Sequence, residues 1–452
     1  MNTKFNEYRN TYKEIIYRDY LVDDIDNDLV ITYTFEIPGL TVFKPTISFS
    51  KDLIKNSFIN ENLMNKIIFH IGMIELISYY KCCCPKKIVI EAGYLSDYDK
   101  SWFKKLFYNG LGEFLYKNNI SISEDELFDF EVTGEEIKLE DVFYQGYGNL
   151  IPVGGGKDSV VSLELLKEYK DDNNCFIINP KGANIECCYV AGYMDEDIVK
   201  IKRVIDKNLI DLNSKGFLNG HTPFSSIVAF ISYLMAYLTN KKYIVLSNEN
   251  SANEATVIGT NVNHQYSKSY EFEKDFHDFT IKNYGIDINY FSMLRPLKEI
   301  QIAMLFSKYT KYHKVFKSCN LGSKGSTWEW CCNCPKCLFV YIMLSAFLSK
   351  SEMVEMFGKD LLNQKELEKD FIELIGEGET KPFECVGSIS EVNFALNKII
   401  ASYEGELPYL LNLYKNNYLK DENIDLFELE ENHNVISEYY DILKENVFNY
   451  EK

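Results

Sequence analysis

The sequence lacks any long basic run. Its 48 lysines and arginines are outnumbered by 67 aspartates and glutamates, which gives a formal net charge of -19. A protein that grips a nucleic-acid backbone needs clustered Lys and Arg to displace counterions. We therefore expect no nucleic-acid partner, although a local basic pocket for a small anionic ligand is compatible with this charge balance.

Long apolar runs are missing as well. Residues 1–20 alternate charged and apolar side chains and lack the apolar core of a signal peptide. The most apolar stretch, 224–238, is about 15 residues long, which is too short to span a bilayer comfortably. We expect a cytoplasmic protein without a membrane partner, so its 12 cysteines should be thiols or metal ligands rather than disulfides.

The pattern of the chain changes twice along its 452 residues, a length that predicts two or three domains. Residues 1–145 mix strand and helix signals and predict an α+β domain of unknown role. Residues 146–345 alternate apolar runs, such as a strand expected at 185–190, with helical stretches, which predicts an α/β domain with a parallel sheet. Residues 346–452 predict a mostly helical region.

A glycine turn stands between a predicted strand and a predicted helix. It reads Gly154, Gly155, Gly156, Lys157, Asp158, Ser159. Glycines let the backbone approach a ligand, and the dipole of the following helix favours an anion. Lys157 adds positive charge, Asp158 can hold Mg²⁺, and Ser159 can donate to a phosphate oxygen. The turn is not a Walker A loop, because Ser or Thr does not directly follow the lysine.

This turn resembles the Ser-Gly-Gly-x-Asp-Ser loop of the ATP pyrophosphatases, the PP-loop family, with Gly154 in place of the leading Ser. The resemblance implies an adenine nucleotide α-hydrolase-like sheet domain that binds ATP, attaches AMP to a substrate and releases pyrophosphate. Ser247 and Asn248 follow another predicted strand and should lie on the same ligand-binding rim. We expect both to contact ATP.

Four cysteines have metal-ligand spacing. Cys331, Cys334 and Cys337 form a C-x2-C-x2-C run, and Cys319 lies just upstream. Four thiolates on a short segment suit tetrahedral zinc with a structural role. The alternative is a set of reduced core thiols.

Further segments resemble a narrower family. They are 218–221 (Leu-Asn-Gly-His), 246–253, 262–269, 294–297 (Leu-Arg-Pro-Leu) and 381–387 (Lys-Pro-Phe-Glu-Cys-Val-Gly). Together with the glycine turn and the cysteines, they resemble the UDP-N-acetylmuramoyl-L-alanyl-L-glutamate epimerases of bacterial cell-wall synthesis. That resemblance implies inversion of the terminal L-glutamate of a UDP-muramoyl dipeptide with ATP and magnesium, and a functional link to the ligase that adds L-glutamate.

Several polar residues are candidates for catalysis or substrate binding. His264 is the first candidate for proton transfer, because imidazole titrates near neutral pH; its alternative is a structural histidine. Cys385 is a second candidate, although a buried inert thiol is a competing interpretation. Glu249 can be a base, a magnesium ligand or a ribose contact. The remaining candidates are predicted to bind substrate phosphate or carboxylate, or else to be surface or structural groups: Lys268, Arg295 and His221.

Three other functions compete with an epimerase. An ATP-dependent ligase or amidotransferase would capture the same acyl-adenylate with an amine. A PP-loop enzyme that modifies tRNA or a nucleobase is disfavoured by the acidic charge balance. A nucleotide-sensing module would bind ATP without releasing AMP or pyrophosphate.

Overall fold

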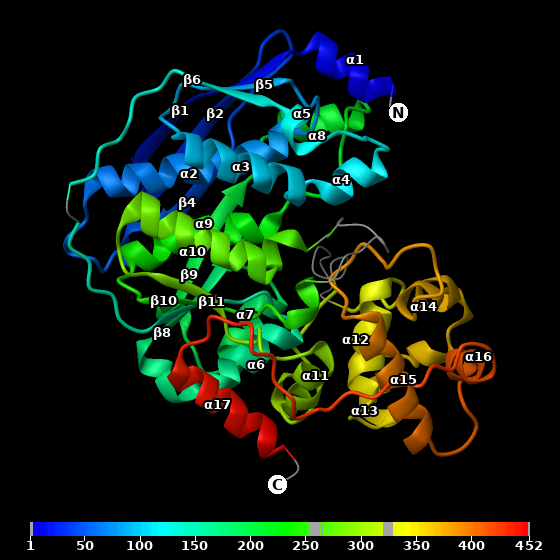
Figure 1. Ribbon diagram of the computed structural model, residues 1–452. Helices are drawn as coiled ribbons and strands as arrows, with labels where there is room; N and C mark the ends of the chain where they lie inside the picture. Colours follow the sequence, from blue (N-terminus) through cyan, green and yellow to red (C-terminus); the bar gives the residue numbers. More distant parts are fainter. Residues whose placement is uncertain (1–2, 141, 254–262, 264, 320–328, 451–452) are drawn as a thin grey trace.

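One mixed sheet organises the chain (Figure 1). The computed structural model describes residues 3–140, 142–253, 263, 265–319 and 329–450. In those residues the sheet has 11 strands in the order β11-β10-β7-β8-β9-β4-β2-β1-β5-β6, with β3 paired to β2. Most neighbouring strands are parallel, so the predicted α/β class is confirmed.

One half of the sheet is entirely parallel. Its strands are β7 (Asn149–Pro152), β8 (Asn173–Ile178), β9 (Ile198–Val204), β10 (Tyr243–Leu246) and β11 (Asn289–Ser292). Phe176 of β8 enters one core, whereas Cys175 and Ile177 enter the other. This alternation is typical of a strand that is covered on both faces. Because the strands are parallel, their carboxyl ends share one edge, which is where such sheets bind ligands.

The other half of the sheet begins with antiparallel strands. They are β1 (Glu14–Ile25), β2 (Asp28–Ile37), β3 (Thr41–Phe43) and β4 (Thr46–Ser50), followed by the parallel strands β5 (Lys87–Ile90) and β6 (Asp129–Val132). Asp26 and Asn27 both have positive φ, as the tight hairpin between β1 and β2 requires. β4 pairs antiparallel with β9, so the sheet continues without a break between the two halves.

Helices cover both faces of the sheet and enclose two apolar cores. The first core includes α2 (Glu61–Tyr80), α3 (Asp97–Gly110), α9 (Phe224–Leu238) and α10 (Tyr270–Tyr284). The second core includes α6 (Lys157–Leu165), α7 (Ala183–Val190), α11 (Glu299–Ser307) and α12 (Pro335–Ser345). α9 is apolar on nearly every side and is almost wholly buried, as expected for a central helix. The short helices α1 (Thr3–Thr11), α4 (Gly112–Lys117), α5 (Glu124–Leu127) and α8 (Lys207–Ser214) lie around the N-terminal half.

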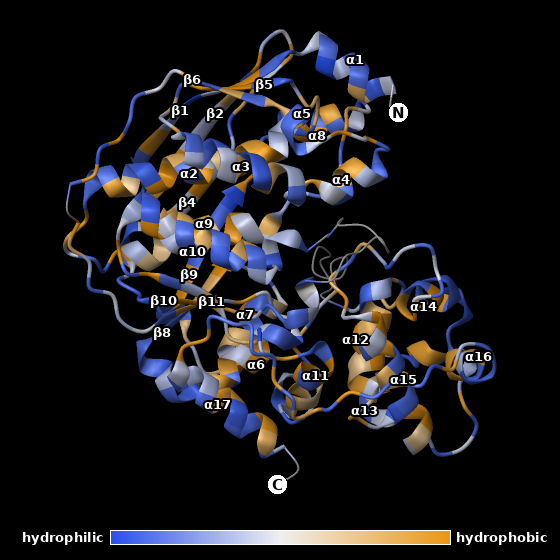
Figure 2. Ribbon diagram, in the orientation of Figure 1, coloured by the Kyte–Doolittle hydropathy of each residue, from blue (hydrophilic) through white to orange (hydrophobic). Residues whose placement is uncertain are grey.

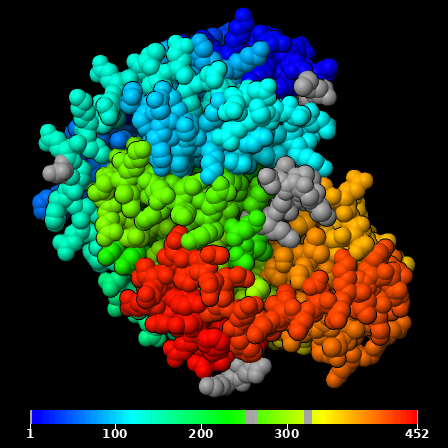
Figure 3. All heavy atoms as spheres, in the orientation of Figure 1, coloured from blue at the N-terminus to red at the C-terminus, as the bar shows by residue number. Residues whose placement is uncertain are grey.

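Beyond residue 345 every regular element of the described chain is helical, as predicted. These helices are α13 (Lys350–Phe357), α14 (Glu368–Leu374), α15 (Ile389–Ser402), α16 (Tyr409–Asn417) and α17 (Ser437–Phe448). Of these, α13, α14, α15 and α16 form a lobe beside the sheet around α12, which is mainly apolar (Figure 2). The C-terminal segment, red in Figure 3, returns to the parallel half, where Tyr439 donates a hydrogen bond to Asn149. In the described part of the chain we find no helix that combines the length and apolar character needed to cross a membrane.

The strand expected at 185–190 is wrong, because this segment is helix α7. Its buried side chains, Ala183, Cys187 and Cys188, recur at helical spacing, and the neighbouring strand position is taken by β9. The aromatic and β-branched residues of the segment suggested a strand, but tertiary packing overrides such local preferences.

Candidate active site

The glycine turn connects β7 to α6 at the carboxyl edge of the parallel strands. Gly155 has φ +84, and a Cβ there would lie 2.6 Å from the Ala183 carbonyl carbon. A Cβ on Gly156 would lie 2.7 Å from the Ser318 hydroxyl oxygen. Gly155 also accepts a 2.8 Å hydrogen bond from the Lys317 backbone N–H. The turn is therefore tightly packed against both α7 and the segment 317–319.

A cavity of about 290 Å³ opens at this turn. Its lining includes Gly154, Gly156, Asp158, Ser159, Ser225, Ser247, Asn248, Lys268, Lys317, Ser318, Cys319, Lys336 and Cys385. Three of the lining residues are lysines and only one is a carboxylate, in a protein whose net charge is -19. The charge of this lining, together with the amino terminus of α6, favours a polyanionic ligand.

Lys157 lies beneath the cavity rather than on its wall. The side chain is 1% exposed, and Nζ pairs with Asp158 Oδ1 and Glu299 Oε2. Burial acts to lower the pKa of Lys157, but the two carboxylates outweigh it and raise this pKa. Burial acts to raise the pKa of Asp158, yet the nearby lysines, Lys157 and Lys336, lower it overall. Asp158 is therefore an ionised carboxylate on the cavity wall.

Lys268 and Cys385 meet at the cavity wall. Lys268 Nζ lies 3.2 Å from Cys385 Sγ. Burial acts to lower the pKa of Lys268, but Cys385 and Glu249 raise it overall, so the ammonium stays charged. Lys336 Nζ donates to the backbone carbonyl of Cys385 and is 8% exposed. Two cations therefore border Cys385, Lys268 at its thiol and Lys336 at its backbone carbonyl.

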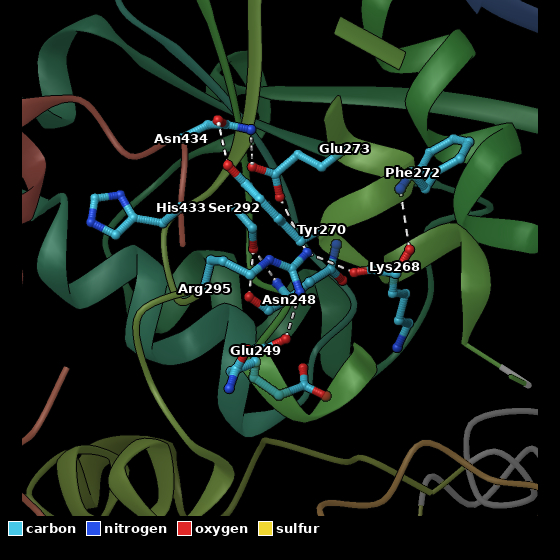
Figure 4. A network of polar contacts seen from close by, with 12 residues as sticks. Asn248, Glu249, Lys268, Tyr270, Phe272, Glu273, Ser292, Arg295, His433 and Asn434 are labelled. Carbon is cyan, nitrogen blue, oxygen red and sulfur yellow. Dashed lines mark hydrogen bonds and ion pairs between the residues drawn. The ribbon is translucent and has the colours of Figure 1, made fainter. Parts of the chain in front are cut away.

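Arg295 holds the backbone behind the cavity and is itself fully buried (Figure 4). Its guanidinium donates 2.6 Å hydrogen bonds to the carbonyls of Glu249 and Lys268. Glu273 pairs with the guanidinium at 3.1 Å and accepts a second hydrogen bond from Asn434. Because Arg295 does not line the cavity, its placement favours a positioning role over the direct substrate contact predicted from sequence.

Ser247, Asn248 and Glu249 follow β10 but do not share one environment. Ser247 lines the cavity and donates to Ser162 at 2.8 Å. The backbone of Asn248, which also lines the cavity, exchanges two hydrogen bonds with the Ser292 hydroxyl. Glu249 is 4% exposed, accepts from the Ser251 hydroxyl and is not a cavity residue.

The four predicted zinc ligands converge at the edge of the cavity. The sulfur atoms of Cys319, Cys331, Cys334 and Cys337 all lie within 4.8 Å of one another. Cys331 Sγ is 3.3 Å from Cys334 Sγ and 3.5 Å from Cys337 Sγ. Tetrahedral zinc with bonds of about 2.3 Å places its sulfurs about 3.8 Å apart. The donor set and its spacing therefore fit a metal ion such as zinc.

Comparison with known proteins identifies the family of the chain. The model of the MurL N-terminal domain matches residues 6–293, and that of the MurL C-terminal domain matches residues 315–420. The chain belongs to the MurL family. A protein of Xanthomonas oryzae pv. oryzae named UDP-N-acetyl-alpha-D-muramoyl-L-alanyl-L-glutamate epimerase is 32% identical over 343 residues, 75% of each chain. A protein of Salinispora tropica with the same name is 35% identical over 343 residues, 74% of this chain and 73% of the relative.

Of the two histidine candidates in this MurL-family chain, only His221 lies among the described residues. His221 precedes α9, and its Nδ1 lies 3.4 Å from Glu113 Oε2 in the N-terminal half. His221 does not line the cavity. His264 lies outside the described residues, so its role stays a prediction.

Among the cavity residues of this MurL-family protein that sequence reasoning missed are Lys317, Ser318 and Lys336. Each lies within two residues of a cysteine of the metal-binding set. This closeness in sequence is the signal that could have found them. If the cysteines hold a metal beside the glycine turn, the residues next to those cysteines must also lie near the turn.

Proposed function

We propose that this protein is an ATP-dependent epimerase with a PP-loop ATP site, which inverts the terminal L-glutamate of UDP-N-acetylmuramoyl-L-alanyl-L-glutamate. The observation that carries the ATP-dependent part is the lysine-rich cavity at the glycine turn. The names of the MurL-family relatives support the substrate. A protein acting on this precursor would serve peptidoglycan synthesis after the ligase that adds L-glutamate.

An adenylation step explains why an epimerase would need ATP. The α-proton next to a free carboxylate is hard to remove, because the carbanion would form beside an anion. Attack of the carboxylate oxygen on the α-phosphorus of ATP expels pyrophosphate and gives an acyl-adenylate. The acyl group accepts electron density, so a side-chain base can remove the α-proton. Reprotonation from the other face inverts the centre, and water then releases the acid and AMP.

The cavity residues can be given roles in the adenylation step. The backbone amides of the glycine turn and the Ser159 hydroxyl would bind the phosphates, and Ser247 and Asn248 would contact the nucleotide. Asp158 would hold Mg²⁺, which binds proteins through one or two carboxylates and completes its shell with phosphate oxygens. That ion supplies charge neutralisation at the phosphates.

Proton transfer is assigned to the thiol side of the cavity. Cys385 is the candidate that lines the cavity, and Lys268 beside it would stabilise its thiolate. Glu249 is held behind the wall, where its contact with Ser251 suits a supporting role better than contact with substrate. His264 is retained as the partner on the opposite face of the α-carbon.

The direct test is incubation of the purified protein with ATP, Mg²⁺ and UDP-N-acetylmuramoyl-L-alanyl-L-glutamate. Hydrolysis of the product followed by chiral chromatography should detect D-glutamate, together with AMP and pyrophosphate. Omission of ATP should abolish the D-isomer. Formation of D-glutamate without ATP would refute the adenylation mechanism, and absence of D-glutamate under all conditions would refute the epimerase assignment.

A further inference from the structure

One wall of the cavity is built from two chain segments that the cysteine cluster brings together. Lys317 and Ser318 directly precede Cys319, and Lys336 lies between Cys334 and Cys337. All of these side chains except Cys334 and Cys337 line the cavity. The wall that carries two of the three cavity lysines is thus continuous with the metal-binding set.

The first of these segments is fixed to the glycine turn. The Lys317 backbone N–H donates to the Gly155 carbonyl at 2.8 Å. Ser318 lies so close to Gly156 that a Cβ there would meet its hydroxyl. The Lys317 ammonium lies over the Trp330 ring, 5.6 Å from its centroid, next to Cys331. Residues 317–319 therefore connect the glycine turn to the cysteine cluster.

The second segment is the first turn of α12. Cys334 caps this helix, and its Sγ accepts from the Cys337 N–H. Lys336 follows Pro335 in this first turn, is 8% exposed, and is held over the Phe339 ring at 5.5 Å. A lysine this buried keeps little rotational freedom, so the position of its Nζ depends on the position of the helix start.

We propose that the cysteine cluster, once it holds its metal, aligns Lys336 with the glycine turn so that Lys336 binds the two outer phosphates of ATP. This inference rests on the ATP-binding part of the proposed function but not on epimerisation. Lys336 and Asp158 share the cavity wall beside the amino terminus of α6, where an anion is favoured. The metal joins residue 319 to the start of α12, so its occupancy and ATP affinity are linked.

The first test measures nucleotide affinity by calorimetry in the zinc-loaded full chain. Lys336→Ala removes the ammonium and should weaken ATP binding by about 10-fold or more, since a charge-assisted contact to phosphate is lost. AMP, which lacks the outer phosphates, should bind the variant within about 2-fold of the wild type. Lys336→Arg should restore part of the ATP affinity.

The matched control is Lys314→Ala. Lys314 lies shortly before Cys319 in the sequence, but its side chain is 81% exposed. It pairs with Glu355 and does not line the cavity. This control should bind ATP as the wild type does. Elemental analysis should find the same zinc content in Lys336→Ala and the wild type, which separates loss of the phosphate contact from loss of the metal.

A second test uses the wild-type protein alone. If the metal favours ATP binding, ATP must favour metal retention by the same factor. The fraction of zinc transferred at equilibrium from the wild type to a chromogenic chelator should therefore fall severalfold with saturating ATP and much less with AMP.

The outcomes separate the two proposals. ATP affinity of Lys336→Ala equal to that of the wild type, or an equilibrium zinc transfer that ATP does not reduce, would overturn this inference and leave the epimerase proposal intact. A wild type that binds no ATP would overturn both. A wild type that behaves as described but forms no D-glutamate would overturn the epimerase proposal alone.

Discussion

Adjacent glycines of the turn should respond in opposite ways to the same substitution. Gly154 is exposed, its φ lies outside the left-handed region, and no atom of the described residues other than its chain neighbours lies within 4 Å of a Cβ built there. Gly155 is buried, has φ +84, and has Ala183 and Asn184 backbone atoms 2.6 Å from such a Cβ. Gly154→Ala and Gly155→Ala therefore form a matched pair that adds one methyl group at neighbouring positions.

The expected cost follows from these two environments. At Gly155 an alanine would incur about 1–2 kcal/mol for the left-handed backbone. Displacement of the α7 backbone would add about 1–3 kcal/mol. The free energy of unfolding should therefore fall by roughly 2–5 kcal/mol. At Gly154 the methyl group meets no neighbour among the described residues, and alanine restricts the unfolded chain, so stability should change by less than about 1 kcal/mol.

Urea unfolding followed by circular dichroism, with melting temperatures as a second readout, measures both effects. The Gly155→Ala midpoint should fall clearly below that of the wild type, while Gly154→Ala should stay near it. Equal midpoints for the two variants, or a larger loss for Gly154→Ala, would refute the described packing of the turn.

Three further predictions concern other parts of the structure. Asp158→Ala should abolish AMP formation while leaving the protein folded; a folded variant that still releases AMP in a coupled assay would remove Asp158 from the site. His70 is fully buried, and burial lowers its pKa to about 3. Stability should therefore fall as the pH drops below about 6.5, by about 1.4 kcal/mol per unit. Between pH 7 and 5 urea titrations should show about 2 kcal/mol more loss for the wild type than for His70→Phe, and equal losses would contradict the buried neutral imidazole. Arg295→Met should cost about 3–5 kcal/mol, because it leaves the buried Glu273 carboxylate uncompensated. In thermal unfolding, adding Glu273→Gln to Arg295→Met should recover part of that loss. A loss equal to the sum of the two single effects would contradict an interaction between these two side chains.

The sequence was most informative where a function depends on neighbouring residues. The glycine turn, Ser247, Asn248 and the four cysteines were recognisable because their spacing is local, and the structure gathers members of all three groups at one cavity. The cysteines at 331, 334 and 337 meet Cys319 because the segment before Cys319 is anchored on the turn itself. Local spacing therefore predicted the glycine turn and the cysteine set, but not the cavity residues that lie next to the cysteines.

The role of Arg295 could not be read from its own segment. Its guanidinium is satisfied by the Glu249 and Lys268 carbonyls and by Glu273, which in turn needs Asn434, 161 residues further along the chain. Such contacts arise from tertiary packing, so an arginine that binds substrate and one that fixes a backbone look alike in sequence. The pairing of β4 with β9 was unpredictable for the same reason.

The most direct test of the central claim is solvent deuterium exchange at the α-carbon of the terminal glutamate. With the L-glutamate-ended substrate and Mg²⁺ in deuterated water, mass spectrometry should detect no label without ATP. With ATP, label should enter together with AMP formation, because adenylation is what makes the α-proton acidic. A ligase would form AMP without exchange. Deuterium incorporation in the absence of ATP would contradict the account.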